Sequence, residues 1–372
     1  MRVPDNIKTF ALSDEGLKPY IMFQDYWNHF KALNGATNVE FMKVKEDGTP
    51  ISFAEKEEQM NLALKSEILK HASVTTLDTF SIEQWANHPS IRWATFAVIS
   101  AMIDMVLPQS LIESIGLYTD VRAIGFGDSA SFDVKPRDLF VISKAGRAQR
   151  TAEMRKQFSG QITVLPENRQ ISVQVALYKV LAGKESLAEF VAKAIMSIES
   201  EVTRDVFTVF NTAMEALDNA GDDALRYAGY TQSTLVALAQ KVSAWNGGQR
   251  AIVAGTQLAL QNILPADSNY RYDFQSDFVK VGYIRTAFGY DVMALPQVAD
   301  WRTEFKLMLD DNNVYVLSPS ANKLVKLVLE GATLSNVSGM YDRANLTQDA
   351  TLYKAWGTAI ATNALAGIIT LA

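Results

Sequence analysis

The side chains that enzymes commonly use for nucleophilic and metal chemistry are scarce in this chain. It has no cysteine, so disulfides, thiolate nucleophiles and cysteine-bound metals are excluded. Its three histidines, His29, His71 and His88, are scattered through the first quarter of the sequence without the spacing of metal ligands. The composition therefore predicts no metal, no cofactor and no catalytic residue.

Two short motifs resemble ligand sites but are better explained as turns. The sequence Gly125-Phe-Gly127-Asp128 matches part of a dinucleotide-binding motif, yet the third glycine and the surrounding strand-turn-helix unit are missing. Residues 310–313, Asp-Asp-Asn-Asn, carry oxygen ligands but lack the spaced carboxylates and final glutamate of a calcium loop, which favours a hairpin turn. The usual motifs of ATPases, metalloproteases and esterases are absent as well.

Basic side chains are concentrated in one short part of the chain. Residues 121–180 carry 10 basic and 5 acidic groups, whereas residues 1–120 carry 10 and 16 and residues 181–372 carry 15 and 20. The centre of this basic segment contains Lys144, Arg147, Arg150, Arg155 and Lys156. Three explanations are open: a nucleic-acid patch, a solvated loop, or an arm that binds the acidic body of an identical neighbour. The acidity of the flanking segments favours the third.

The elements around this segment are predicted from hydrophobic periodicity. From Val121 onward apolar residues alternate with polar ones up to about Val175, which indicates strands, and residues 144–160 connect them as the tip of a long hairpin. A period of 3.6 then begins at Ser186, which forms an S-x-x-E capping box with Glu189, and continues to about Leu217. At 1.5 Å per residue this predicts a helix roughly 50 Å long.

The flanking regions predict helices before the hairpin and mixed structure after the long helix. Helices are expected at 53–72, 91–106 and, after Pro108, 109–115; the apolar stretch 93–107 is too short to span a membrane and reads as a buried helix. No signal peptide is evident, which predicts a cytosolic origin. Further strands are expected at 251–254, 279–285, 290–295, 305–309, 314–317, 323–329 and 367–371, and further helices at 233–245 and 257–264. The fold class is therefore α+β.

This order of parts resembles the major capsid proteins of tailed bacteriophages with the Hong Kong 97-like fold. The segments that carry the resemblance are Val121–Ala130, Asp138–Glu153 and Leu181–Phe190. The resemblance implies an N-terminal arm and helical region at 1–120, an extended hairpin loop at 121–181, and the spine helix of a peripheral domain at 182–224. It further implies an axial domain at 225–320 and a return to the peripheral domain at 321–372.

By the same resemblance the chain would assemble in the host bacterial cytoplasm into hexamers and pentamers of an icosahedral virion. The shell would enclose double-stranded DNA without reading its sequence, with a portal and a scaffolding protein as partners and no membrane. Two other functions stay open: the shell of an encapsulin-type nanocompartment, which the long N-terminal region disfavours, and a cytosolic enzyme with an unrecognised carboxylate site, which no sequence feature supports.

Overall fold

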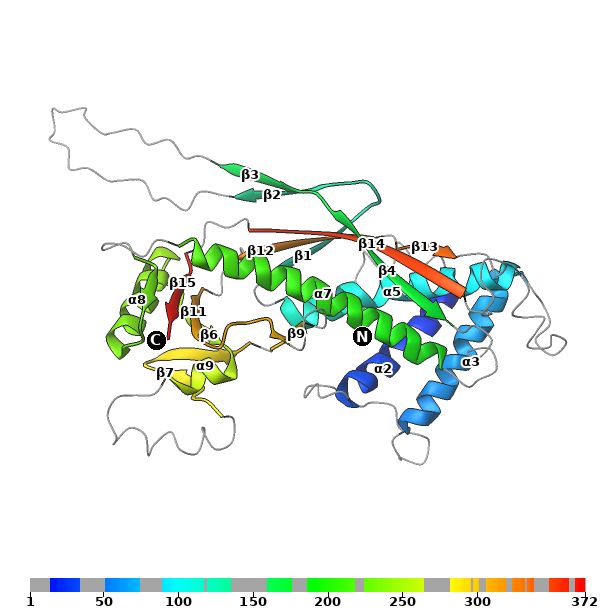
Figure 1. Ribbon diagram of the computed structural model, residues 1–372, viewed down its shortest axis with the longest axis horizontal. Helices are drawn as coiled ribbons and strands as arrows, with labels where there is room; N and C mark the ends of the chain where they lie inside the picture. The colour runs from blue at the N-terminus through cyan, green and yellow to red at the C-terminus, as the bar shows by residue number, and fades with distance from the viewer. Residues whose placement is uncertain are drawn as a thin grey trace.

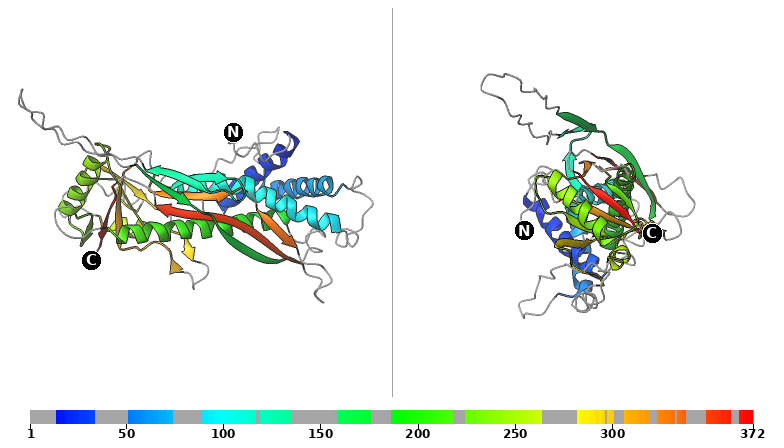
Figure 2. Two further views of the ribbon diagram at one scale, coloured as in Figure 1. Left: turned by 90° about the horizontal axis from the view of Figure 1, so that it is seen from above. Right: turned by 90° about the vertical axis from the view of Figure 1, so that its left-hand side faces the viewer.

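The computed structural model shows an elongated molecule in which one long helix links two sheets (Figures 1 and 2). It describes residues 14–33, 51–73, 89–116, 119–134, 159–175, 186–217, 224–263, 282–295, 297–300, 306–318, 323–331, 333–337, 348–360 and 365–371. The long helix is α7 (Leu187–Glu215), and its buried residues follow the predicted 3.6-residue period. Its 29 residues correspond to about 44 Å of axial length.

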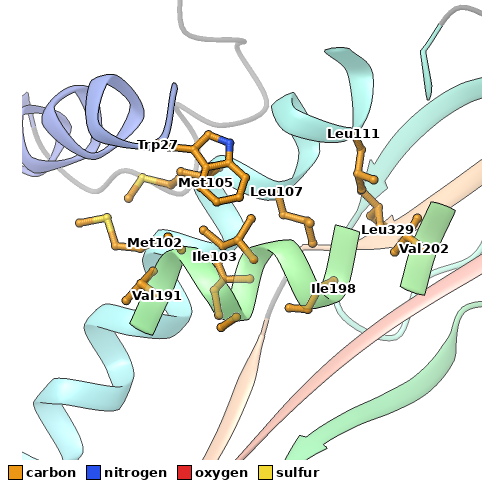
Figure 3. Close-up of a cluster of buried hydrophobic side chains, with 14 of the residues drawn as sticks. Trp27, Met102, Ile103, Met105, Leu107, Leu111, Val191, Ile198, Val202 and Leu329 are labelled. Atoms are coloured by element: carbon orange, nitrogen blue, oxygen red, sulfur yellow. The ribbon is translucent and has the colours of Figure 1, made fainter. Parts of the chain in front are cut away.

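Three further helices pack against one another and against α7: α2 (Asp14–Leu33), α3 (Phe53–His71) and α5 (Pro89–Ile115). Their apolar faces share one core with α7, part of which is drawn in Figure 3. By length and composition, residues Trp93–Ile115 of helix α5 could cross a membrane. However, 72% of this apolar stretch is buried inside the protein. This agrees with the predicted buried helix.

Helix α5 corrects one prediction, because it continues through Pro108 where two helices were expected. A proline inside a helix removes one hydrogen bond and costs about 3 kcal/mol. Leu107, Leu111 and Ile115 are all at most 1% exposed, and each buried side chain of this size contributes about 1.5–3 kcal/mol. Packing on both sides of the proline therefore outweighs the local penalty.

The first sheet has five strands among the described residues and is covered by α5 and α7. Its strands are β1 (Thr119–Ile124), β4 (Glu167–Val175), β12 (Val325–Glu330), β13 (Leu334–Val337) and β14 (Gln348–Ile360). Strand β14 is the centre, since it pairs with β4 on one edge and with both β12 and β13 on the other, while β1 adds to β12 in parallel. Segments separated by about two hundred residues thus lie side by side.

In the part of the chain that the structure describes, the second sheet has six strands. It packs with helices α8 (Gln232–Trp245) and α9 (Gln257–Gln261) around a separate core. In spatial order its strands are β5 (Arg226–Ala228), β15 (Gly367–Thr370), β11 (Asn313–Leu317), β6 (Ile252–Gly255), β8 (Tyr290–Ala294) and β7 (Thr286–Ala287).

The last strand lies in a different sheet from the other strands of residues 321–372. Strands β12, β13 and β14 belong to the first sheet, but β15 pairs with β11 and β5 in the second sheet. Ile368 and Ile369 are at most 2% exposed there, and Ile368 is part of the core around α7 whereas Ile369 is part of the core around α8. Both faces of this strand are therefore buried.

Two local predictions in the second half are also corrected. Residues 310–313 do not join a hairpin, because the preceding β10 (Lys306–Leu307) pairs with β9 (Ala299–Asp300) while β11 belongs to the six-stranded sheet. The side-chain amide of Gln297 instead makes two hydrogen bonds to the backbone of Leu309. Its NH2 group donates to the Leu309 carbonyl, and its oxygen accepts from the Leu309 N–H. The strand expected at 279–285 is irregular over its described part, 282–285, where Gly282 has a φ of 85°. The α+β class itself is confirmed.

Candidate assembly surface

The described base of the predicted hairpin is a two-stranded ribbon at the periphery of the molecule (Figures 1 and 2). Strands β2 (Ala130–Val134) and β3 (Gly160–Val164) pair antiparallel, with Ala130 opposite Val164. Along β2 the buried side chains alternate with exposed ones, as a ribbon covered on one face requires. We call residues 130–134 and 160–164 the stem.

An apolar contact fixes the stem on the first sheet. Ala130, Phe132 and Val164 of the stem pack on Val328 of β12, and all four are at most 7% exposed. Because an isolated two-stranded ribbon is only marginally stable in water, this contact is what allows the stem to keep a defined direction.

Charged groups surround the ring of Phe132. The Arg122 guanidinium lies 4.2 Å from the ring centroid and the Lys326 ammonium 5.5 Å from it, both within the range of a cation–π contact. Asp120 Oδ2 lies 3.5 Å from Arg122 and 3.3 Å from Lys326. The Lys326 side chain is only 4% exposed, so its charge is compensated by a carboxylate and an aromatic face rather than by water.

The glycine motif before the stem forms a turn, as predicted. Gly127 has a φ of 78°, and the Asp128 N–H donates to the Gly125 carbonyl at 3.3 Å. The Gly127 N–H donates to Glu330 Oε1 at 2.6 Å, so a buried carboxylate at the end of β12 holds the turn in place. Phe126, at the top of this turn, is 67% exposed.

A second polar contact ties the strand that follows the stem to the long helix. Asp205 of α7 accepts hydrogen bonds from Arg169 of β4 at 3.2 Å and from the Trp356 indole of β14 at 3.0 Å. The Arg169 guanidinium also lies 5.8 Å from the Trp356 ring. Strands β4 and β14 are therefore attached to α7 by one carboxylate as well as by apolar packing.

The start of α7 is held by its own cap and by α3. Ser186 Oγ accepts from the Glu189 N–H at 3.2 Å, which is the serine half of the expected capping box. The Glu189 carboxylate pairs with Lys193 at 2.6 Å, so the reciprocal half is replaced by an ion pair along the helix. Asn61 of α3 adds a tertiary cap, because its side chain donates to Ser186 Oγ and accepts from the Ala188 N–H.

The five basic residues predicted for the tip, Lys144, Arg147, Arg150, Arg155 and Lys156, lie outside the described residues. Among the described parts of the chain no group of three His, Asp or Glu residues is placed to hold a metal ion. His29 packs edge-on against Phe53, and burial lowers its pKa. The groups that contact the stem and the turn before it, Lys326 and Glu330, are about two hundred residues away in sequence, so no local pattern could reveal them.

Comparison with known proteins gives a family match over most of the chain. The model of the family described as "SPbeta prophage-derived putative capsid protein YonB" matches residues 37–370. A comparison with curated proteins finds no match.

Solved structures with a similar chain include phage capsids and the capsid of a GTA particle. The capsid of cyanophage P-SCSP1u is 14% identical with a TM-score of 0.46, covering 70% of this chain and 88% of that one. The capsid of a native GTA particle is 11% identical with a TM-score of 0.46, covering 70% and 90%. The mature capsid of bacteriophage PhiM1 is 11% identical with a TM-score of 0.44, covering 68% and 86%.

Proposed function

Because this chain belongs to the YonB family of prophage-derived capsid proteins, we propose that it is the major capsid subunit of a tailed phage. Copies would assemble into the hexamers and pentamers of an icosahedral head with the Hong Kong 97-like fold. The family match covers residues 37–370, which include both sheets, the stem and α7, so the proposal concerns the whole fold rather than one part of it.

The observation that carries the mechanism is the anchored stem. The stem packs on the first sheet through Phe132, and the turn that leads into it is held by Glu330, so the base of the hairpin has a fixed position on its own subunit. The segment from 121 to 180 has a net charge of +5, and the segments on either side have −6 and −5. A basic tip on a rigid stem would find its complement on the acidic body of the next copy, which makes the association directional.

Assembly by surfaces rather than by a pocket accounts for the scarcity of catalytic groups, and we assign the chain no catalytic activity. The shell would enclose double-stranded DNA without sequence-specific contacts, with a portal and a scaffolding protein as further partners. Assembly would take place in the host cytoplasm. The encapsulin alternative is not favoured by the family match.

Electron microscopy of the purified protein tests the proposal directly. We expect closed shells, or capsomers of five and six subunits, from the wild-type chain. The variant Arg147→Glu/Arg150→Glu/Arg155→Glu should remain folded but assemble poorly, because like charges then face each other across the contact. The wild-type chain should also assemble less well at high salt, because salt screens the attraction between exposed charges. The screening length is about 8 Å at physiological ionic strength and shortens as salt is added.

A matched control shows whether assembly depends on charge at the tip or only on the net charge of the chain. Reversing the exposed basic residues Lys70, Arg285 and Lys306 to glutamate changes the net charge by the same amount, from −6 to −12, because each reversal removes one positive and adds one negative charge. This control should still assemble. Equal loss of assembly in both variants would contradict a role of the tip, and a monomer under all conditions would contradict the capsid function.

A further inference from the structure

The stem crosses the first sheet beside a position of β14 that carries no side chain. Strand β4 begins at Glu167, which pairs with Trp356 of β14. Two residues, Leu165 and Pro166, connect the end of β3 to this first residue of β4. The next residue of β14 is Gly357, and the connection passes directly over it. The chain therefore changes at this point from pairing with β14 to lying on the face of the sheet.

The contact at Gly357 leaves no room for a side chain. A Cβ atom added there would lie 2.5 Å from the Leu165 carbonyl oxygen and 2.9 Å from Val164 Cγ1, and Cβ atoms in proteins essentially never approach another heavy atom within 3.0 Å. Gly357 is buried in a regular strand, and its φ lies outside the left-handed region. The close approach of the connection, rather than the backbone conformation, therefore requires glycine at this position.

The Leu165 backbone is restricted on the side of β4. Because Pro166 follows, Leu165 is confined to extended conformations, so its carbonyl group cannot rotate freely away from the sheet. Strand β4 is fixed by its pairing with β14 and by the hydrogen bond from Arg169 to Asp205 at 3.2 Å. The stem, in contrast, is a two-stranded ribbon with a small apolar contact to β12. A methyl group on Gly357 should therefore displace the stem rather than β4.

The crossing lies at the centre of the contact between the stem and the sheet. Gly357 pairs with Val328 of β12, and Val328 is the residue on which the stem packs. We propose that Gly357 is a positioning residue for the hairpin, because its lack of a side chain lets the stem lie directly on β12 and so determines where the proposed arm leaves the subunit. The consequence for assembly rests on the proposed capsid function, whereas the effect on the stem does not.

The absence of cysteine in the wild-type chain allows the stem to be followed with a single thiol. Ala130 is 7% exposed in the contact with β12, so the thiol of Ala130→Cys should react slowly with a maleimide in unassembled subunits. When Gly357→Ala is added, this thiol should react at least about tenfold faster, which is the change in an opening equilibrium that a typical overpacking penalty produces. Equal reaction rates with and without Gly357→Ala would overturn the proposal.

A second thiol distinguishes displacement of the stem from a general loss of stability. Ala188 of α7 is fully buried in the shared core, and the thiol of Ala188→Cys should react at the same slow rate with and without Gly357→Ala. If Gly357→Ala accelerates both thiols equally, the glycine serves the whole fold, and the positioning role is refuted. Gly160→Ala adds the same methyl group within the stem, where it meets only Val134 at 3.9 Å, and should leave the reaction of Ala130→Cys unchanged.

Electron microscopy then connects the position of the stem with assembly. Without added thiols, Gly357→Ala subunits should lose the ability to form closed shells at a concentration where the wild type and Gly160→Ala both form them. Normal shells from Gly357→Ala, in spite of a faster reaction of the Ala130→Cys thiol, would overturn its role in assembly. Failure of the wild type to form shells would instead refute the capsid function, and the thiol measurements on unassembled subunits would still decide whether Gly357 positions the stem.

Discussion

Replacing Lys354 by methionine probes a buried ion pair that joins the helical layer to the first sheet. The Lys354 ammonium of β14 contacts Asp104 Oδ1 of α5, and the two side chains are 4% and 15% exposed. Thr333 adds two donors to the same carboxylate, its hydroxyl to Oδ1 and its N–H to Oδ2 at 2.9 Å. We expect the removal of one charge to destabilise the protein more than the removal of both.

The expected loss of unfolding free energy in Lys354→Met depends on the charge of Asp104, which is left without its partner. Breaking a buried pair by removing one partner typically costs about 3–5 kcal/mol. In Lys354→Met the uncompensated Asp104 can escape this cost by binding a proton. From an ordinary pKa of 3.8 this requires about 4 kcal/mol at pH 7, which sets an upper limit. Asp104→Leu should cost about as much, since it leaves the ammonium buried.

The double variant Asp104→Leu/Lys354→Met should lose only about 1–3 kcal/mol, because the main unpaired group that remains is the Thr333 N–H. Equilibrium unfolding of unassembled subunits in urea, followed by tryptophan fluorescence, gives the three free energies of unfolding. The expected coupling between the two sites is several kcal/mol. A double variant whose loss equals the sum of the two single losses would refute the reasoning.

The dependence on pH supplies an independent check. Burial is the largest influence on Asp104 and raises its pKa above the ordinary value, in spite of Lys354 and Thr333. The carboxyl therefore holds its proton more tightly in the folded than in the unfolded protein. Its stabilising contribution is complete below the ordinary pKa and is lost as the pH rises through the folded value. Between these two pKa values the free energy of unfolding should therefore decrease with rising pH. Asp104→Asn has no carboxyl to titrate in this range and should remove that decrease.

Two smaller changes test the supports of the stem and of α7 by the same unfolding measurement. Gly127→Ala should cost about 1–2 kcal/mol, because the φ of 78° disfavours a side chain although the space around it is open. Gly160→Ala in the stem, where the new methyl group meets only Val134 at 3.9 Å, is its control and should change little. Ser186→Ala should cost about 1 kcal/mol through loss of the helix cap, and an unchanged stability would show that Asn61 holds this end alone.

Hydrophobic periodicity predicted correctly the helices and strands that bury one apolar face in a core. The long helix, the α3 helix and the start of α8 lie within a few residues of their expected limits because their apolar stripes are buried in one core. The alternation at Phe132 likewise predicted the stem, since a ribbon covered on one face has a period of two. The capsid family was also identified correctly from the order of these parts.

The predictions were wrong or incomplete where the structure depends on contacts between residues far apart in the sequence. Pro108 predicts a break, and only the burial of both flanks of α5 keeps that helix whole. The apolar strand 367–370 could have joined either sheet, and its placement depends on pairing with β11, some fifty residues away. The charged partners of the stem are also invisible in sequence, because Lys326 and Glu330 follow an ordinary strand pattern and acquire their role only when β1 pairs with β12.

The position of the stem is set by residues outside the stem. On one side the stem rests on Val328, and the turn that leads into it is held by Glu330; both residues belong to β12. On the other side the chain leaving the stem becomes β4, whose Arg169 is bound to Asp205 of α7. Strands β12 and β4 are both paired to β14, so these supports move as one unit. We therefore expect a force on the stem to be transmitted to α7 and the shared core, which is the property that the proposed arm needs if it is to hold a neighbouring subunit.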